Sequence, residues 1–152
     1  MTHRFVHSDR VQFADTDMAG IMHFANFFRF MERAETAFYR SLGLSIVDRP
    51  KDAPHDERVG WPRVNATCDY FAPLRFEDAV EVEVLVEEIR TRSIRFIFRI
   101  RKQDGILAAE GRITTVCVRK DKASGEMRAV EIPVRIREKI GAAPAEIIKR
   151  PK

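Results

Sequence analysis

The residues best placed to do chemistry lie just before a strongly helical segment of this sequence. Carboxylates, a glycine and a histidine fall within a few positions there, in the run Asp15-Thr16-Asp17-Met18-Ala19-Gly20-Ile21-Met22-His23-Phe24-Ala25-Asn26. A carboxylate can act as a base or a nucleophile, and the free N–H groups at the start of a helix can stabilise an oxyanion. These are the two groups that an acyl-transfer site needs.

The segment that follows is predicted to be one long helix. Apolar residues recur there at three- and four-residue spacing, at Phe27, Phe30, Met31, Ala34, Phe38 and Leu42. We expect Asn26 to cap the start of this helix and Gly43 to close its end. Because further apolar residues widen the stripe, we expect the helix to be surrounded on several sides.

The second half of the chain has the alternating pattern of β-strands. Residues 80–87 and 94–101 alternate apolar with charged side chains, and a reversal near Thr91 would pair them antiparallel. The expected pairs are Glu81 with Arg101, Glu83 with Arg99, Leu85 with Ile97, and Glu87 with Arg95. We interpret this charged face as a solvated or subunit-facing ladder. A further strand over residues 106–118 has small residues on one face, which would let the helix lie close.

These elements together predict an α+β fold, with a curved antiparallel sheet of about five strands wrapped around one long central helix. We expect a single domain over residues 1–152, with its core at about residues 5–120 and a peripheral tail at residues 133–152.

Composition narrows the class of protein further. The chain carries 27 Lys and Arg against 23 Asp and Glu, and this small excess is dispersed rather than gathered into a nucleic-acid-binding patch. No apolar run approaches the ~20 residues that span a bilayer, and charges interrupt the N-terminus where a signal peptide would lie. We therefore expect a cytoplasmic protein without a nucleic-acid partner.

Cys68 and Cys117 stand outside any metal-binding motif, and we expect neither a metal nor a cofactor.

One family shares the pattern of the N-terminal motif. The order Phe13-Ala14-Asp15-Thr16-Asp17-Met18-Ala19-Gly20, then Asn26-Phe27-Phe28, then Glu32, resembles that of the 4-hydroxybenzoyl-CoA thioesterase-like family of hotdog-fold acyl-CoA thioesterases. The strand end from Val64 to Leu74, with its Tyr/Phe-x-x-Pro-Leu pattern, and the hairpin at Thr91-Arg92-Ser93 fit as well. Most of residues 5–118 can be aligned in this way.

The resemblance implies roles for individual residues. Asp17 corresponds to the catalytic carboxylate, and the backbone N–H of Phe24 corresponds to the group that polarises the thioester carbonyl. Gly20 would supply the turn into the helix, and Asn26 would hold the helix entrance in shape. His23 makes the pocket more polar there. Its side chain would either contact the substrate or form a hydrogen bond to the backbone.

The implied activity is hydrolysis of an acyl-CoA thioester. Asp17 would activate water as a general base or attack the carbonyl directly and form a mixed anhydride. For the phosphates of coenzyme A, the candidate contacts are Arg63, Arg92 and Ser93. An acyl-carrier protein is an alternative thioester donor. The resemblance also implies a homo-oligomer, a dimer or a tetramer, with the site at the subunit interface.

Several alternatives remain open at this stage. Asp15 and Asp17 can be explained as turn and cap residues, and we favour that interpretation for Asp15. Glu35 on the helix is the rival catalytic carboxylate. A hydratase or dehydratase would pair His23 with Asp17, and a non-enzymatic module would bind acyl-CoA or acyl-carrier protein without turnover. The sequence does not identify the acyl group.

Overall fold

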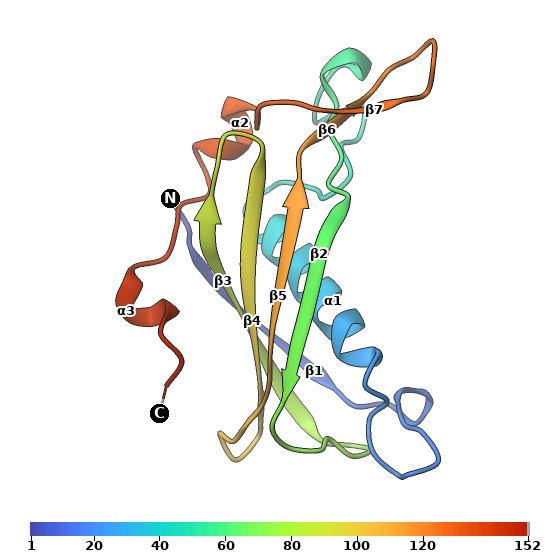
Figure 1. Cartoon of the computed structure of the whole chain (residues 1–152), viewed down its shortest axis with the longest axis vertical. Coiled ribbons are helices and arrows are strands. Elements are labelled where there is room, and N and C mark those ends of the chain that lie inside the picture. Colours follow the sequence, from blue (N-terminus) through green and yellow to red (C-terminus); the bar gives the residue numbers. More distant parts are fainter. Residues whose placement is uncertain (152) are drawn as a thin grey trace.

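The computed structural model describes residues 1–151 and shows an antiparallel sheet wrapped around one long helix (Figure 1). The helix is α1 (Asn26–Ser41). The strands are β1 (Arg4–Arg10), β2 (Arg63–Tyr70), β3 (Ala79–Ile89), β4 (Ser93–Lys102) and β5 (Leu107–Val116). They form a 5-stranded sheet in the order β1-β3-β4-β5-β2, so β1 and β2 are its edges. The predicted α+β architecture is confirmed.

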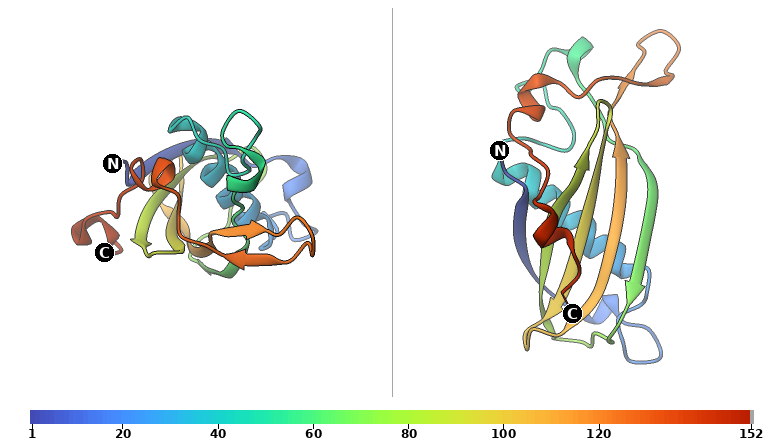
Figure 2. Two further views of the ribbon diagram at one scale, coloured as in Figure 1. Left: turned by 90° about the horizontal axis from the view of Figure 1, so that it is seen from above. Right: turned by 60° about the vertical axis from the view of Figure 1, so that its left-hand side comes forward.

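Shorter elements surround this core (Figure 2). Strands β6 (Val118–Lys120) and β7 (Met127–Ala129) form a separate hairpin. The remaining elements are the 3-10 turns η1 (Phe13–Asp15) and η2 (His55–Glu57) and the short helices α2 (Val134–Arg137) and α3 (Ala145–Ile148). No helix within residues 1–151 combines the length and the apolarity needed to cross a membrane.

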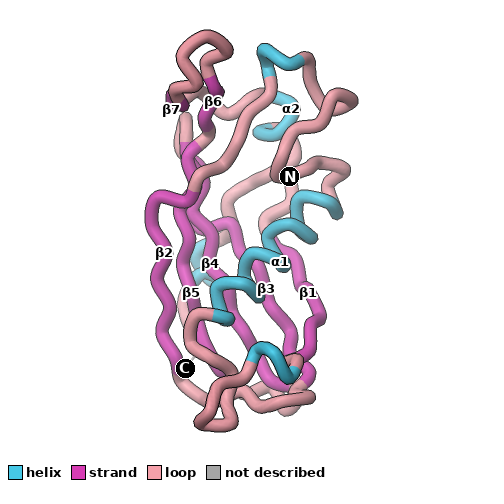
Figure 3. The backbone as a smooth tube through the Cα atoms, turned by 90° about the vertical axis from the view of Figure 1, so that its right-hand side faces the viewer, coloured by secondary structure: helices cyan, strands magenta, loops and turns pink. Residues whose placement is uncertain are grey.

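Helix α1 lies against one face of the sheet along most of its length (Figure 3). Its predicted stripe is buried, including Phe30, Met31 and Phe38. At Gly111 of β5, a Cβ atom would overlap with the Met31 side chain and approach the Thr67 carbonyl. The small residue there lets the helix approach the sheet closely, as the sequence predicted.

The two ends of α1 differ from each other in how well they were predicted. Gly43 follows the helix with a φ of 72°, a conformation that glycine adopts without strain, as expected. Asn26 does not cap the start, because it is the first helical residue and Ala25 occupies the cap position. The Asn26 side chain instead donates a hydrogen bond from Nδ2 to the carbonyl oxygen of Asp15, 2.8 Å away.

The predicted register of β3 and β4 is confirmed at three of its four pairs: Glu81 with Arg101, Glu83 with Arg99, and Leu85 with Ile97. The fourth pair is wrong, because a bulge after Val86 places Glu88 opposite Arg95. Glu87 still forms an ion pair with Arg95, at 3.1 Å. Two adjacent glutamates therefore share one arginine.

The charged face of the sheet, expected to be solvated or subunit-facing, is partly covered by another segment of the same chain. Arg99 and Glu110 are 3% and 2% exposed, because the C-terminal segment lies across this face (Figure 2). Arg99 donates to the carbonyl oxygens of Ile147 and Ile148 at 2.7 and 2.6 Å, and its Nε lies 3.0 Å from Glu110.

The tail also contributes to the core. Ile136 and Ile140 are buried among the core side chains, and the N–H of Ala143 donates to the carbonyl oxygen of Val86 at 2.7 Å. Residues 133–151 are thus less peripheral than the sequence indicated.

Replacing Arg99 tests whether its contacts with Glu110 and with the tail stabilise the fold. Arg99→Leu leaves Glu110 without its buried partner and frees two carbonyl oxygens of the tail, so we expect a loss of about 3 kcal/mol in the free energy of unfolding. Arg101→Leu on the same strand is the matched control, because its side chain is partly exposed, and we expect a loss under about 1 kcal/mol. Urea unfolding measures both, and equal losses would contradict the role of Arg99.

Candidate active site

Asp17 sits in a tight turn whose backbone fixes its position. The Asp17 N–H donates to the carbonyl oxygen of Ile21 and the Asp17 carbonyl accepts from the Gly20 N–H, each at 3.0 Å. Gly20 has a φ of 78°, which explains why glycine stands there. Oδ1 of Asp17 accepts from the Ala19 N–H at 2.9 Å, whereas Oδ2 has no hydrogen-bond partner within residues 1–151. The side chain thus has a turn role and still presents a free carboxylate oxygen.

The carbonyl of Asp15 anchors the helix entrance. It accepts two hydrogen bonds, from the His23 N–H at 2.9 Å and from Nδ2 of Asn26 at 2.8 Å. The Asp15 carboxylate accepts the N–H of Gln12 at 2.8 Å and closes the η1 turn. This geometry supports the structural interpretation of Asp15 and places Asn26 where it can hold the entrance in shape.

The backbone N–H of Phe24 differs from its neighbours in having no hydrogen-bond acceptor within residues 1–151. It donates to no acceptor in the described part of the chain, whereas the N–H groups on either side of it are bonded. The His23 side chain accepts the Ala25 N–H at Nδ1, 3.1 Å away, and its ring stacks on Phe24. Of the two interpretations of His23, the bond to backbone is the one present here.

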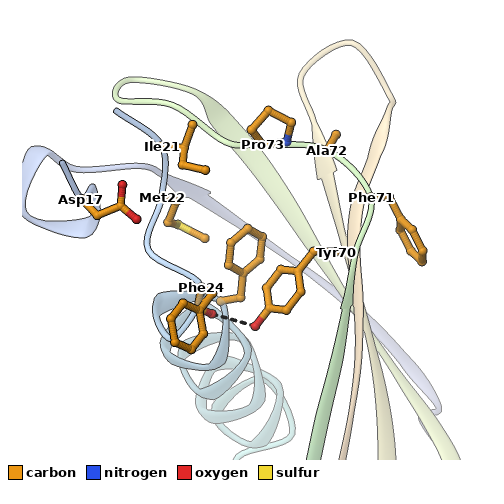
Figure 4. A pocket seen from close by; sticks show the side chains of 9 residues that line it. Asp17, Ile21, Met22, Phe24, Tyr70, Phe71, Ala72 and Pro73 are labelled. Carbon is orange, nitrogen blue, oxygen red and sulfur yellow. Dashed lines mark hydrogen bonds between the residues drawn. The ribbon is translucent and has the colours of Figure 1, made fainter. Parts of the chain in front are cut away.

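A cavity of about 390 Å³ opens beside these groups (Figure 4). It is lined by Asp17, Ile21, Met22, Phe24, Phe27, Tyr70, Phe71, Ala72 and Pro73. Asp17 is the only ionisable carboxylate in this otherwise apolar and aromatic lining. Phe28, which follows Phe27 in the N-terminal motif, is not among the lining residues. An acyl group would find apolar surface here next to both a carboxylate and an unbonded N–H group.

Tyr70 is a site residue that the sequence reasoning missed. Its hydroxyl donates to the carbonyl oxygen of Phe24 at 2.9 Å (Figure 4). Its ring packs edge-on against that of Phe27, with 4.9 Å between the ring centroids. The signal was present in the strand-end pattern, since Tyr70 begins the Tyr-x-x-Pro-Leu run that ends at Leu74. The Leu74 carbonyl accepts the Met22 N–H at 2.6 Å and so ties that run to the site.

The three proposed phosphate contacts do not join Asp17 within one chain. Arg92 and Ser93 lie at the turn between β3 and β4, at the opposite end of the sheet from the cavity (Figure 1). Arg63 starts β2, whose far end carries Tyr70, and its guanidinium is 3.0 Å from Glu35. Their role toward coenzyme A stays a prediction.

Glu35, the rival carboxylate, lies outside the cavity that holds Asp17. It is fully buried, with one oxygen paired to Arg63 and the other without a hydrogen-bond partner. Burial raises the pKa of this carboxyl despite the opposing charge of Arg63. No group of three His, Cys, Asp or Glu side chains suited to a metal ion was found within residues 1–151.

A sheet curved around one helix, with a carboxylate and a free amide at the helix N-terminus, is the arrangement expected of a hotdog-fold thioesterase. The sequence model of the thioesterase-like superfamily matches residues 11–140 of this chain. The chain therefore belongs to that superfamily, which confirms the family and the hotdog fold that the motif predicted.

Individual relatives agree with this assignment. The acyl-CoA thioester hydrolase YbgC of Escherichia coli is 32% identical over 109 residues, which cover 72% of this chain and 78% of that protein. The structure of a gentisyl-coenzyme A thioesterase is 30% identical, with a TM-score of 0.73 over 88% of this chain and 99% of that chain. A 1,4-dihydroxy-2-naphthoyl-CoA thioesterase from Synechocystis shares the fold, with a TM-score of 0.78 at 22% identity over 90% of this chain and 94% of that chain.

The buried state of Glu35 predicts a pH dependence of stability. Because burial raises the pKa of Glu35 in the folded state, the native protein holds this proton more tightly than the unfolded chain. Wild type therefore loses stability as the pH rises from the ordinary carboxyl range through the raised pKa. Glu35→Gln cannot titrate, so we expect its melting temperature to rise relative to that of wild type as the pH increases above the ordinary carboxyl range. A difference that stays constant as the pH increases would contradict the raised pKa.

Proposed function

We propose that this protein hydrolyses acyl-CoA thioesters, with Asp17 as the general base or nucleophile and the N-terminus of α1 as the oxyanion site. One observation carries the proposal: the free oxygen of Asp17 and the unbonded N–H of Phe24 belong to residues that line the same apolar cavity. Membership in the thioesterase-like superfamily and the likeness to YbgC, a named acyl-CoA thioester hydrolase, support the reaction class.

The chemistry follows from these positions. With the acyl chain in the cavity, the Phe24 N–H and the helix dipole polarise the thioester carbonyl. Asp17 takes a proton from water while the water oxygen bonds to the carbonyl carbon. The tetrahedral oxyanion then collapses, the carbon–sulfur bond breaks, and the coenzyme A thiolate recovers a proton. In the nucleophilic variant, an oxygen of Asp17 bonds to the carbonyl carbon, the thiolate leaves, and water hydrolyses the mixed anhydride.

The proposal includes a second copy of the chain, which pairs with the first through edge strand β2. Strand β2 is an edge of the sheet, its residues are mostly exposed, and Val64 is 60% exposed. Unpaired edge strands favour pairing with another chain. A partner at this edge would extend the sheet and could bring Arg63, Arg92 and Ser93 of one copy toward coenzyme A bound at the other.

The substitution Asp17→Asn tests the proposed carboxylate. The amide keeps the turn geometry but neither accepts a proton nor attacks a carbonyl, so we expect kcat to fall by a factor of about 10² or more. Free-thiol release from aromatic, short, medium and long acyl-CoAs measures this. Asp15→Asn and Glu35→Gln are the matched controls, and we expect both to retain turnover within a few-fold.

Each failure has a distinct meaning. Activity lost in Glu35→Gln but kept in Asp17→Asn would transfer the carboxylate role to Glu35. Reversible hydration of an enoyl-CoA without thiol release would favour the hydratase alternative. Affinity for acyl-CoA without turnover in either form would favour the binding module.

The oligomeric state is tested by sedimentation of the full chain. We expect a dimer or a tetramer at the concentrations used for assay, because edge strand β2 is left open in one copy. A monomer with full thioesterase activity would contradict a site at the subunit interface.

A further inference from the structure

We propose that Tyr70 is a positioning residue for this site: its hydroxyl holds the peptide group between Phe24 and Ala25, which is joined through the Phe24 Cα to the peptide group that carries the Phe24 N–H, and so helps to keep that N–H in place. This inference rests on the proposed function, in which that N–H receives the oxyanion. Tyr70 comes from the end of β2, whereas Phe24 precedes α1, so the contact joins the sheet to the helix entrance.

The helix itself leaves the Phe24 carbonyl unused. In a regular continuation of α1, this oxygen would accept the N–H of Phe28. Phe28 instead donates to the carbonyl oxygen of Ala25, at 3.2 Å. The hydroxyl of Tyr70 takes the vacant acceptor at 2.9 Å. The bond therefore satisfies a carbonyl for which the helix supplies no donor.

The same peptide group is held at its other end. The Ala25 N–H donates to Nδ1 of His23 at 3.1 Å, so one rigid plane is fixed by side chains from two different segments. The neighbouring His23 carbonyl accepts the N–H of Asn26 at 2.9 Å. Among the backbone N–H groups of residues 23–26, three donate within the described chain and only that of Phe24 does not.

Burial of the Phe24 side chain contributes little to holding this turn, because that side chain is 65% exposed, against 44% for Tyr70. Tyr70 is better anchored: it pairs with Ala109 of β5, and its ring packs edge-on against the buried Phe27. Desolvation raises the pKa of Tyr70 to about 12, so its hydroxyl stays protonated and remains a donor at working pH. A preorganised donor stabilises a developing oxyanion without reorganising during the reaction, and small misplacements of such groups slow turnover.

The test is Tyr70→Phe, which removes the hydroxyl and keeps the ring. We expect kcat on the preferred acyl-CoA to fall about tenfold while KM stays within about twofold, because the lost bond acts on the oxyanion donor and not on the acyl pocket. Tyr39→Phe is the matched control, since the Tyr39 hydroxyl is buried and has no hydrogen-bond partner within residues 1–151. It should keep the kcat and KM of wild type.

A second variant separates the ring from the hydroxyl. Tyr70→Leu removes the aromatic wall of the cavity as well, so we expect the loss in kcat to be joined by a rise in KM. Thermal melting confirms that each variant is folded. A Tyr70→Phe enzyme with wild-type kcat, or one altered in KM alone, would overturn the positioning role.

Amide hydrogen exchange tests the contact without relying on activity. In Tyr70→Phe the peptide group loses one of its two anchors, so we expect the Ala25 N–H to exchange faster than in wild type and in Tyr39→Phe. If wild type releases no thiol from any acyl-CoA, the proposed function fails, and exchange still decides whether Tyr70 holds the turn. Unchanged exchange at Ala25 would overturn the inference.

Discussion

The close packing of α1 against the sheet is the constraint on which the rest of the structure depends. Met31 occupies the space over Gly111 where a side chain would otherwise stand, so the helix can be buried along its length. Inside the helix, every N–H is bonded within the backbone, and only the first turn leaves donors free. The N–H group of the proposed oxyanion site accordingly lies just outside α1, in the loop before Asn26 at one end of the sheet.

Alternation in the sequence predicted the central strands because one face is buried and the other carries charges. Side chains in a strand alternate between the two faces with a period of two residues, and this period fixes the register of two strands wherever the alternation is regular. Glu83 and Arg99 were paired correctly for this reason. It could not reveal the bulge, because Glu87 and Glu88 are chemically equivalent neighbours and either can pair with Arg95. The burial of Arg99 was equally hidden, since it depends on a tail whose place is set by tertiary contacts.

The site divides in the same way into local and distant parts. The turn at Asp17 and Gly20 and the helix entrance at Asn26 are encoded within a dozen residues, and the motif was sufficient to find them. Tyr70 lies 46 residues away from Phe24 and meets it only because the fold brings the end of β2 to the residues that precede α1. Arg63 shows a related limit: its charge suggested a phosphate contact, which stays a prediction, but no local pattern indicated that its guanidinium lies 3.0 Å from Glu35 within the chain.

The positions of the two helix-associated carboxylates explain why their chemistry should differ. Glu35 lies in the middle of α1, where backbone N–H groups are already bonded, and its burial and the guanidinium of Arg63 leave little room for water. Asp17 precedes the helix and borders an apolar cavity next to an N–H that the backbone does not use. A carboxylate that acts as a base for thioester hydrolysis is most effective beside a group that receives the oxyanion. The proposal therefore favours Asp17, because Asp17 and Phe24 line the same cavity of this chain.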